Sequence, residues 1–248
     1  MGYILMMDKR ILGIIPARGG SKSIPRKNIK LFAGKPLIAW AIETLRESGV
    51  IDRIVVSTDD QEIAEVAKKY GAEVPFLRPV ELAQDTTPTL PVLQHTVRWL
   101  KENESYSPDY VLLLEPTSAG KRPFHVEGVV KTLLEGGADA AISVAEVPGV
   151  FSPHWQIRVA DDGRTELFTG EPFKKVIRRR QDLPKTYYRN SSIYAFRPEL
   201  LFSDDPSFYG EDVRAYVTDS KYAFDIDTPE DWEEAESMFK KILEEEKK

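Results

Sequence analysis

Apolar residues recur along this chain in two periods, and their alternation predicts helices and strands in turn. Residues 37–45 carry apolar side chains at helical spacing, and residues 53–57, RIVVS, are centred on the apolar run of a buried strand. The continuously apolar run 110–114 predicts a central strand covered on both faces. Together with the apolar run 11–17, this order predicts an α/β protein with an open, mainly parallel sheet.

The same alternation extends through the rest of the chain. Apolar stripes at helical spacing predict further helices, and short apolar runs between them predict further strands. The predicted helices contain residues 63–67, 90–100 and 126–134, and the predicted strands are 74–77, 140–144, 192–196 and 222–226. A last helix is expected to begin near Pro229.

The alternation stops between Pro148 and Pro184, where we expect an excursion from the sheet. Prolines, a basic run over 174–180 and aromatic residues without an obvious cover replace the periodic pattern. The aromatic residues are Phe151, Trp155, Phe168 and Phe173. Such a segment predicts either a lid or subunit contact, or a packed β-hairpin flap with a solvated charged face. We assign residues 9–248 to one domain, with 148–187 as the excursion.

Composition narrows the classes of function. A chain of 248 residues with 42% hydrophobic content is long enough for one large α/β domain. Its net charge of -6 argues against nucleic-acid binding, which needs a broad basic face. Because the chain has no cysteine, disulfides, thiol nucleophiles and thiolate metal sites are excluded, and a bound metal must use oxygen or histidine. The three histidines share no metal-ligand spacing.

The sequence contains no pattern of a membrane segment. No apolar run reaches the roughly 20 residues that span a bilayer. The apolar start, residues 1–7, is followed directly by Asp8 and Lys9 and lacks the cleavage pattern of a signal peptide. We therefore expect a cytoplasmic protein whose ligands are small molecules, with no membrane and no nucleic acid as partner.

The stretch 14–28, IIPARGGSKSIPRKN, is the first feature that carries chemistry, because a strand there ends in a glycine-rich basic loop. Gly19 and Gly20 let backbone N–H groups approach an anion, and long cationic side chains supply charge for phosphate oxygens. These cations are Arg18, Lys22, Arg26 and Lys27. The spacing does not fit a Walker A loop, and an ordinary solvated turn is the alternative. The order strand, basic turn, helix favours a nucleotide site.

A pair of acids near the end of the chain is the second such feature. Asp225 and Asp227 lie two positions apart in a segment expected to be extended, so both carboxylates can project to one side. Mg²⁺ prefers such oxygen ligands and shares them with substrate phosphates. Alternatively, Thr228 or Asp227 caps the last helix, with Pro229 at its first position, and both interpretations can hold together. A nucleotide site requires the basic loop and the acid pair to face each other across one cleft.

Six motifs, in this order along the chain, resemble those of the acylneuraminate cytidylyltransferase family, the CMP-sialic acid synthetases. They are IIPARGGSKSIPRKN (14–28), VSTDD (56–60), RPVELAQDTT (78–87), LEPTS (114–118), RRRQDLPKTYYRN (178–190) and DIDTPEDW (225–232). The resemblance implies a three-layer nucleotidyltransferase fold of the GT-A/Rossmann-like kind, with 148–187 as a protruding dimerisation arm over the partner's active site. It also implies transfer of CMP from CTP to a 2-keto-3-deoxy sugar acid, with release of pyrophosphate, by a Mg²⁺-dependent homodimer.

The resemblance further implies roles for single residues. Arg18 and Lys22 are expected to clamp the triphosphate, and Asp225 and Asp227 to bind the metal; these four form the expected catalytic set. Further residues are expected to bind the nucleotide. In the loop these are Ala17, Gly19, Gly20 and Ser21; near phosphate and base they are Lys27 and Asn28; in the outer wall they are Arg78, Asp85 and Thr86. Those expected on the sugar side are Glu115, Thr117, Arg180 and Gln181.

Three departures from the family pattern bear on the loop and on the acceptor. Ser23 follows the loop lysine where the family usually has glycine, and residues 190–192, Asn-Ser-Ser, replace Asn-Gly-Ala. Glu115 replaces an amide, and a carboxylate beside the acceptor should face a hydroxyl or amino group of the sugar. The expected acceptor is therefore a sialic-acid-like nonulosonic acid or an octulosonic acid, amino-bearing or otherwise modified. A Kdo-type, amino-Kdo-type or other sugar nucleotidyltransferase, and a non-catalytic nucleotide-binding protein, are the alternatives.

Overall fold

The fold is built on a sheet of six strands within residues 9–247, the part of the chain that the computed structural model describes, apart from the side chains of 190–192. The strands are β1 (Ile11–Pro16), β4 (Arg53–Ser57), β5 (Tyr110–Leu113), β6 (Ala140–Glu146), β9 (Tyr187–Phe196) and β10 (Val213–Thr218). Their order across the sheet is β10-β6-β9-β5-β1-β4. Only β9 runs antiparallel to its neighbours in this sheet, which confirms the mainly parallel arrangement. The interpretation of residues 1–7 lies outside the described residues.

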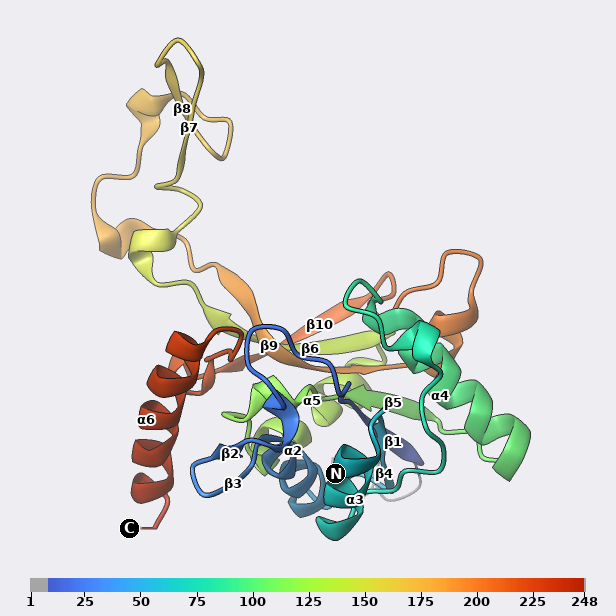
Figure 1. Cartoon of the computed structure of the whole chain (residues 1–248). Coiled ribbons are helices and arrows are strands. Elements are labelled where there is room, and N and C mark those ends of the chain that lie inside the picture. Colours follow the sequence, from blue (N-terminus) through green and yellow to red (C-terminus); the bar gives the residue numbers. More distant parts are fainter. Residues whose placement is uncertain (1–8, 248) are drawn as a thin grey trace.

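Helices cover both faces of the sheet and give three layers (Figure 1). These helices are α2 (Leu37–Glu47), α3 (Gln61–Lys69), α4 (Thr89–Glu104) and α5 (Pro123–Gly136). Because consecutive residues of a strand face opposite sides, Ile15 of β1 joins the core with α2, α3 and α5, whereas Ile14 joins the core with α4. Each helix contains the apolar stripe that predicted it, so the expected three-layer α/β fold is confirmed.

The last helix, α6 (Pro229–Glu245), packs beside the first part of the chain. Trp40 of α2 lies edge-on to Phe239 of α6, with ring centroids 4.7 Å apart. Phe32, in the small ribbon of β2 (Leu31–Phe32) and β3 (Lys35–Pro36), meets Trp232 of α6 at 5.4 Å. This aromatic cluster holds the start of α6 near the loop that follows β1. Within residues 9–247 no helix is both long and apolar enough to cross a membrane.

Two predicted strands are wrong, and one strand was not predicted. Residues 74–77 form no strand: the pairing ends after a single bridge at Glu73, because Pro75 has no N–H to donate. Residues 223–226 are irregular and follow a 3₁₀ helix (Ser220–Tyr222). The sheet instead ends in β10, a mostly exposed edge strand whose mixed sequence, VRAYVT, contains no continuous apolar run.

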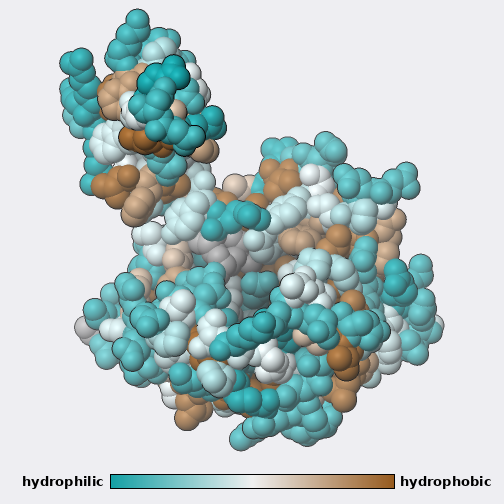
Figure 2. Space-filling view, turned by 45° about the horizontal axis from the view of Figure 1, so that its top comes forward, coloured by the Kyte–Doolittle hydropathy of each residue, from teal (hydrophilic) through white to brown (hydrophobic). Residues whose placement is uncertain are grey.

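Residues 148–186 leave the sheet between β6 and β9 and form a projecting arm (Figure 1). The arm contains a hairpin of β7 (Ile157–Val159) and β8 (Thr165–Leu167). Hydrophobic side chains gather on its surface in Figure 2; the exposed ones are Val150, Phe151, Ile157, Val159, Phe168 and Phe173. The predicted excursion is confirmed, and it is a hairpin flap that still exposes apolar side chains. Its role in dimerisation stays a prediction.

Candidate active site

A cleft opens at the carboxyl ends of β1 and β5, where a parallel sheet usually places its ligand. Four separate segments form it: the loop after β1, the segment leading into α4, the loop after β5, and the segment before α6. Its lining includes Pro16, Arg18, Lys27, Asn28, Arg78, Thr87, Thr89, Glu115, Thr117 and Asp227. The cleft therefore brings together predicted residues of both the nucleotide side and the sugar side.

The basic loop and the acid pair are in direct contact at this cleft. Lys27 Nζ donates a hydrogen bond of 2.8 Å to the carbonyl oxygen of Ile226 and lies 3.4 Å from Asp227 Oδ1. Lys27 and Asp227 are 200 positions apart in the sequence. The two segments thus face one cleft, which confirms the arrangement that a nucleotide site requires.

The loop after β1 has a fixed backbone. The N–H of Gly19 donates to Asp59 Oδ1 at 2.9 Å, and a Cβ on Gly19 would lie only 2.8 Å from an Asp60 carboxylate oxygen. The Asn28 side chain donates to the Arg18 carbonyl at 2.9 Å, and the buried Ala17 donates its N–H to Ser57. Glycine at position 19 is therefore required by a close approach of the loop to the start of α3.

Arg26 has a structural role rather than the phosphate role that its charge predicts. Its backbone adopts a left-handed conformation, with φ at 58°, and its guanidinium pairs with Asp60 and Glu62 at the start of α3. Hydrogen bonding from Arg26 is the main cause that lowers the pKa of Asp60. Of the four cations of this loop, Arg18, Lys22 and Lys27 are thus left for a ligand of the cleft.

Arg18 and Lys22 both pair with Asp85, which comes from the segment leading into α4. Lys22 Nζ lies 2.5 Å from Asp85 Oδ2, and the Arg18 guanidinium donates to the other carboxylate oxygen. The side chain of Lys22 is 82% exposed, so a ligand can reach it. In this segment Thr87, rather than the predicted Thr86, lines the cleft.

Arg78 lines the cleft and also fixes the segment that carries Asp85. Its guanidinium is buried and donates to the Ser57 side chain at 3.1 Å, to the Ser57 carbonyl, and to the Leu82 carbonyl at 3.4 Å. Burial lowers the pKa of Arg78 to about 10, which leaves the side chain charged at neutral pH. The buried Arg78 therefore links the predicted outer wall of the nucleotide site to Ser57 of β4.

The acid pair lies in the irregular segment before α6, and the predicted capping of that helix by Thr228 is confirmed. Thr228 Oγ1 accepts from the Asp231 N–H at 3.1 Å, and Asp231 Oδ2 accepts from the N–H groups of Thr228 and Asp227. Since Thr228 and Asp231 do the capping, the Asp227 carboxylate stays free of it and is 72% exposed. The cap fixes the backbone that presents this carboxylate.

The described residues fit Mg²⁺ only together with a phosphate. Among them, no three His, Asp or Glu side chains are close enough to hold a metal ion by themselves. Mg²⁺ commonly binds through one or two carboxylates, substrate phosphate oxygens and water. Asp227 offers one such carboxylate beside the cationic loop, and Asp225 offers a second, whose charge acts on Glu115 as that of Asp227 does.

Glu115 stands between the cleft and a second, adjoining pocket. It lines both, with Thr89, and burial together with the charges of Asp225 and Asp227 raises the pKa of Glu115. The second pocket, here called the aromatic pocket, is further lined by Leu113, Asp225, Arg189, Tyr194, Phe208 and Tyr209. Arg189 donates to the Tyr209 hydroxyl at 2.6 Å. The sequence did not predict these four residues as site residues: Arg189, Tyr194, Phe208 and Tyr209.

The segment that carries Asp225 rests on Gly120 and Lys121, which the sequence interpretation also missed. A Cβ on Gly120 would lie 2.7 Å from the Phe224 ring and 2.9 Å from the Tyr222 carbonyl oxygen. The buried Lys121 donates to the same carbonyl at 3.2 Å, and burial lowers its pKa to about 8 against the attraction of Asp225. Tight packing thus replaces strand pairing in holding this segment.

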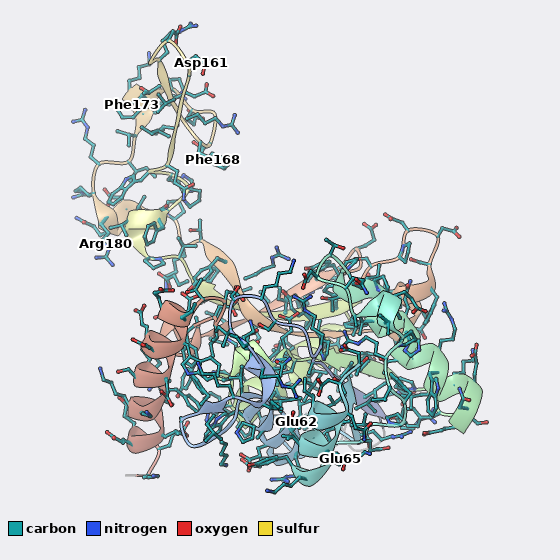
Figure 3. The ribbon with its side chains drawn as sticks, viewed as in Figure 1. Glu62, Glu65, Asp161, Phe168, Phe173 and Arg180 are labelled. Atoms are coloured by element: carbon teal, nitrogen blue, oxygen red, sulfur yellow. The ribbon has the colours of Figure 1, made fainter. Side chains whose placement is uncertain are left out.

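Arg180 and Gln181 do not reach the cleft of their own chain. They lie in a 3₁₀ helix (Arg180–Asp182) of the arm, and Figure 3 shows Arg180 near the arm's base, away from the body. Arg180 lines a different pocket at that base, where its guanidinium covers Gly149. Their predicted position beside the sugar is not met within one chain.

Two solved structures of enzymes share the fold of this chain. The structure of a CMP:2-keto-3-deoxy-manno-octonic acid synthetase complexed with CTP superimposes with a TM-score of 0.68, at 18% identity, over 94% of this chain and 99% of that chain. A 4-diphosphocytidyl-2C-methyl-D-erythritol synthase from Anaerococcus prevotii gives 0.64, at 15% identity and the same coverage. The fold is that of the nucleotidyltransferases.

Sequence relatives identify the family. The family model described as Cytidylyltransferase matches residues 12–248. The CMP-N,N'-diacetyllegionaminic acid synthase of Legionella pneumophila is 36% identical, over 92% of this chain and 96% of that protein. The pseudaminic acid cytidylyltransferase of Campylobacter jejuni is 33% identical with the same coverage, and N-acylneuraminate cytidylyltransferase A of Danio rerio is 33% identical over 92% of this chain and 50% of that protein. The chain belongs to the cytidylyltransferase family, as its motifs predict, and is a nucleotidyltransferase.

Proposed function

We propose that this protein transfers CMP from CTP to a 2-keto-3-deoxy sugar acid of the nonulosonic class and releases pyrophosphate. The observation that carries the proposal is the contact of Lys27 with Ile226 and Asp227, which joins the cationic loop and the acid pair in one cleft. The names of the relatives, which act on legionaminic, pseudaminic and acylneuraminic acids, support the acceptor class.

The reaction is an in-line displacement at the α-phosphorus. The anomeric hydroxyl oxygen of the sugar forms a bond to this phosphorus, the bond to the bridging oxygen of the β-phosphate breaks, and the hydroxyl proton leaves to a base or to water. Arg18 and Lys22 hold the departing pyrophosphate, and Lys27 and Asn28 lie where the rest of the nucleotide binds. Asp225 and Asp227 would hold Mg²⁺, which supplies charge neutralisation at the reacting phosphate when bound.

The aromatic pocket is the proposed acceptor site. It adjoins the nucleotide cleft through Glu115, and it offers the Arg189 cation to the carboxylate of a sugar acid and aromatic rings to its apolar substituents. Glu115 then faces a hydroxyl or amino group, because a charged or neutral carboxyl can accept a hydrogen bond from either.

We further propose a cytoplasmic homodimer in which the arm reaches the partner's cleft. The exposed apolar residues of the arm and the position of Arg180 away from its own cleft support this assembly. Light scattering of the purified protein tests it, because a monomeric mass at micromolar concentration would contradict the dimer.

Pyrophosphate release tests the proposed reaction. The purified protein is assayed with each of the four NTPs, Mg²⁺ and a panel of acceptors: acylneuraminic, legionaminic and pseudaminic acids, Kdo, 8-amino-Kdo and a sugar phosphate. We expect release with CTP and a nonulosonic acid. Release only with Kdo-type acids would move the acceptor to the octulosonic class, and no release with any pair would favour a non-catalytic nucleotide-binding protein.

The variant Glu115→Gln tests the acceptor assignment on the same panel. We expect the variant to change the order of preference among the acids, because an amide donates where a carboxylate only accepts. Glu135→Gln, at an exposed position of α5, removes the same charge far from the cleft and is the control. An unchanged order of preference in Glu115→Gln would contradict the assignment.

A further inference from the structure

The segment 79–88 crosses beside the nucleotide cleft and has a defined shape. It runs from the buried Arg78 to α4 and contributes Thr87 to the lining of the cleft. The N–H of Thr87 donates to the Gln84 carbonyl at 3.1 Å, and its hydroxyl donates to the Glu81 carbonyl at 3.3 Å. These bonds form a turn that contains Asp85.

The Asp85 carboxylate bridges the two cations assigned to the triphosphate. One oxygen lies 2.5 Å from Lys22 Nζ, and the other accepts from Arg18, so both oxygens are engaged. Hydrogen bonding first from Lys22 and then from Arg18 holds the pKa of Asp85 below its usual range, which keeps the carboxylate charged. A carboxylate and a phosphate present the same kind of oxygen to a cation, so the two compete for one place.

We propose that Asp85 is an anionic latch: its carboxylate occupies Arg18 and Lys22 in the nucleotide-free protein, and CTP must displace it to bind. The proposal rests on the proposed function, because it takes these two cations to be the triphosphate site. It differs from the expectation that Asp85 forms part of the wall that contacts the nucleotide, since an anion beside phosphates repels them.

The latch affects both the binding of CTP and the release of pyrophosphate. It weakens the binding of CTP, because two ion pairs must break before the phosphates enter. It also favours the release of pyrophosphate, because Asp85 can return to the two cations as the product leaves. Removing the charge of Asp85 is therefore expected to tighten the binding of both ligands.

Titration calorimetry with CTP, and separately with pyrophosphate, tests the latch in the full-length protein. For Asp85→Asn we expect dissociation constants about threefold to tenfold lower than for the unchanged protein, the scale of one or two exposed ion pairs. The gain should shrink at high salt, which screens the competing charges. Asp85→Ser is expected to show the same gain in affinity. It controls for new hydrogen bonds from the amide side chain that Asp85→Asn introduces.

Glu81→Gln provides the matched control, because it removes an exposed charge from the same segment, and no ion pair of Glu81 with Arg18 or Lys22 is among those of the described residues. Its dissociation constants are expected to equal those of the unchanged protein. Unchanged or weaker binding by both Asp85 variants, while the unchanged protein binds CTP, would overturn the latch and leave the proposed function standing. Absence of CTP binding by the unchanged protein would contradict the proposed function itself.

Discussion

Asp227 combines two properties that a metal ligand beside a triphosphate needs. Its carboxylate is largely exposed, and its backbone is fixed by the hydrogen bond from its N–H to Asp231. The adjacent Lys27 keeps it at the edge of the cationic loop. Rigid presentation of a charge where phosphates bind is the main source of catalysis in phosphoryl-type transfer.

Asp227→Asn is expected to lower turnover by on the order of a hundredfold, the scale of losing one preorganised electrostatic group. The fold should persist, because the Asp227 backbone N–H still donates to Asp231. The measurement is the steady-state rate of pyrophosphate release with CTP and acceptor, with Glu135→Gln as the charge-matched control. A rate within about twofold of the unchanged protein would remove Asp227 from the set of metal ligands.

Charged site residues that belong to a sequence motif could be predicted. Aromatic residues that only line a pocket of the folded chain could not. Arg18, Lys27 and Asp227 belong to runs whose composition points to phosphate or metal, and all three line one cleft. Phe208 and Tyr209 lie in a loop without periodicity, and only the folded chain shows that Tyr209 returns to Arg189 on β9. Single aromatic residues are found in any core, so their types alone give no signal.

The segment 222–227 depends on packing from the loop before α5. Because Gly120 lies against the Phe224 ring and the Tyr222 carbonyl, Gly120→Ala forces backbone atoms apart. We expect a loss of about 1–3 kcal/mol in the free energy of unfolding, the usual cost of overpacking, and a lower rate because Asp225 and Asp227 shift.

Urea unfolding and the pyrophosphate assay measure the two effects of Gly120→Ala. Gly136→Ala, at the end of α5, is the control, since the added methyl makes only an ordinary contact of 3.4 Å with Arg214. Unaltered stability and rate in Gly120→Ala would show that this packing does not position the acid pair.

Helices and strands with a clear hydrophobic periodicity could be predicted almost to their ends. Segments whose structure depends on tertiary contacts could not. The stripe in residues 37–45 predicts α2 (Leu37–Glu47), because a helix buries one face wherever it lies. In the predicted strand 222–226, Tyr222 instead ends a 3₁₀ helix, and Phe224 and Ile226 pack with α6 from irregular chain. β10 escapes prediction for the converse reason: it pairs with β6 at the sheet's edge and remains mostly exposed.

The stability of the molecule as a whole should fall in acid because of His125. This side chain is buried near the start of α5, where its Nδ1 accepts from the Arg122 N–H at 3.0 Å. Burial lowers its pKa to about 3. The unfolded chain takes up a proton below about pH 6.5, whereas the folded chain does not, so stability present above that pH is lost as the pH falls toward 3.

Urea unfolding between about pH 7 and pH 5 measures this contribution, which approaches about 1.4 kcal/mol per pH unit once the unfolded histidine is charged. His125→Gln is expected to flatten the dependence, whatever its effect on absolute stability. His154→Gln, on the arm, is the control for the replacement of a histidine by glutamine. Equal slopes in the unchanged protein and His125→Gln would show that this histidine is not the group responsible.

The arrangement of the molecule depends on one long-range contact, in which α6 brings the end of the chain to the loop that follows β1. The alternation of helices and strands in a mainly parallel sheet follows from periodicity, whereas the meeting of these two charged segments was a hypothesis from their chemistry. The residues of the arm predicted only a break in the pattern that forms a lid, a subunit contact or a hairpin flap, whereas its projection from the body was implied by the family resemblance.

A crystal structure with CTP and Mn²⁺, which stands in for Mg²⁺ and is located by its anomalous scattering, tests most directly whether the basic loop and the acid pair bind one nucleotide. We expect the anomalous peak between the carboxylates of Asp225 and Asp227 and the phosphates, with the β- and γ-phosphates against Arg18 and Lys22. A triphosphate bound on another surface, or Mn²⁺ remote from both aspartates, would contradict the proposal that one cleft unites the two charged segments for catalysis.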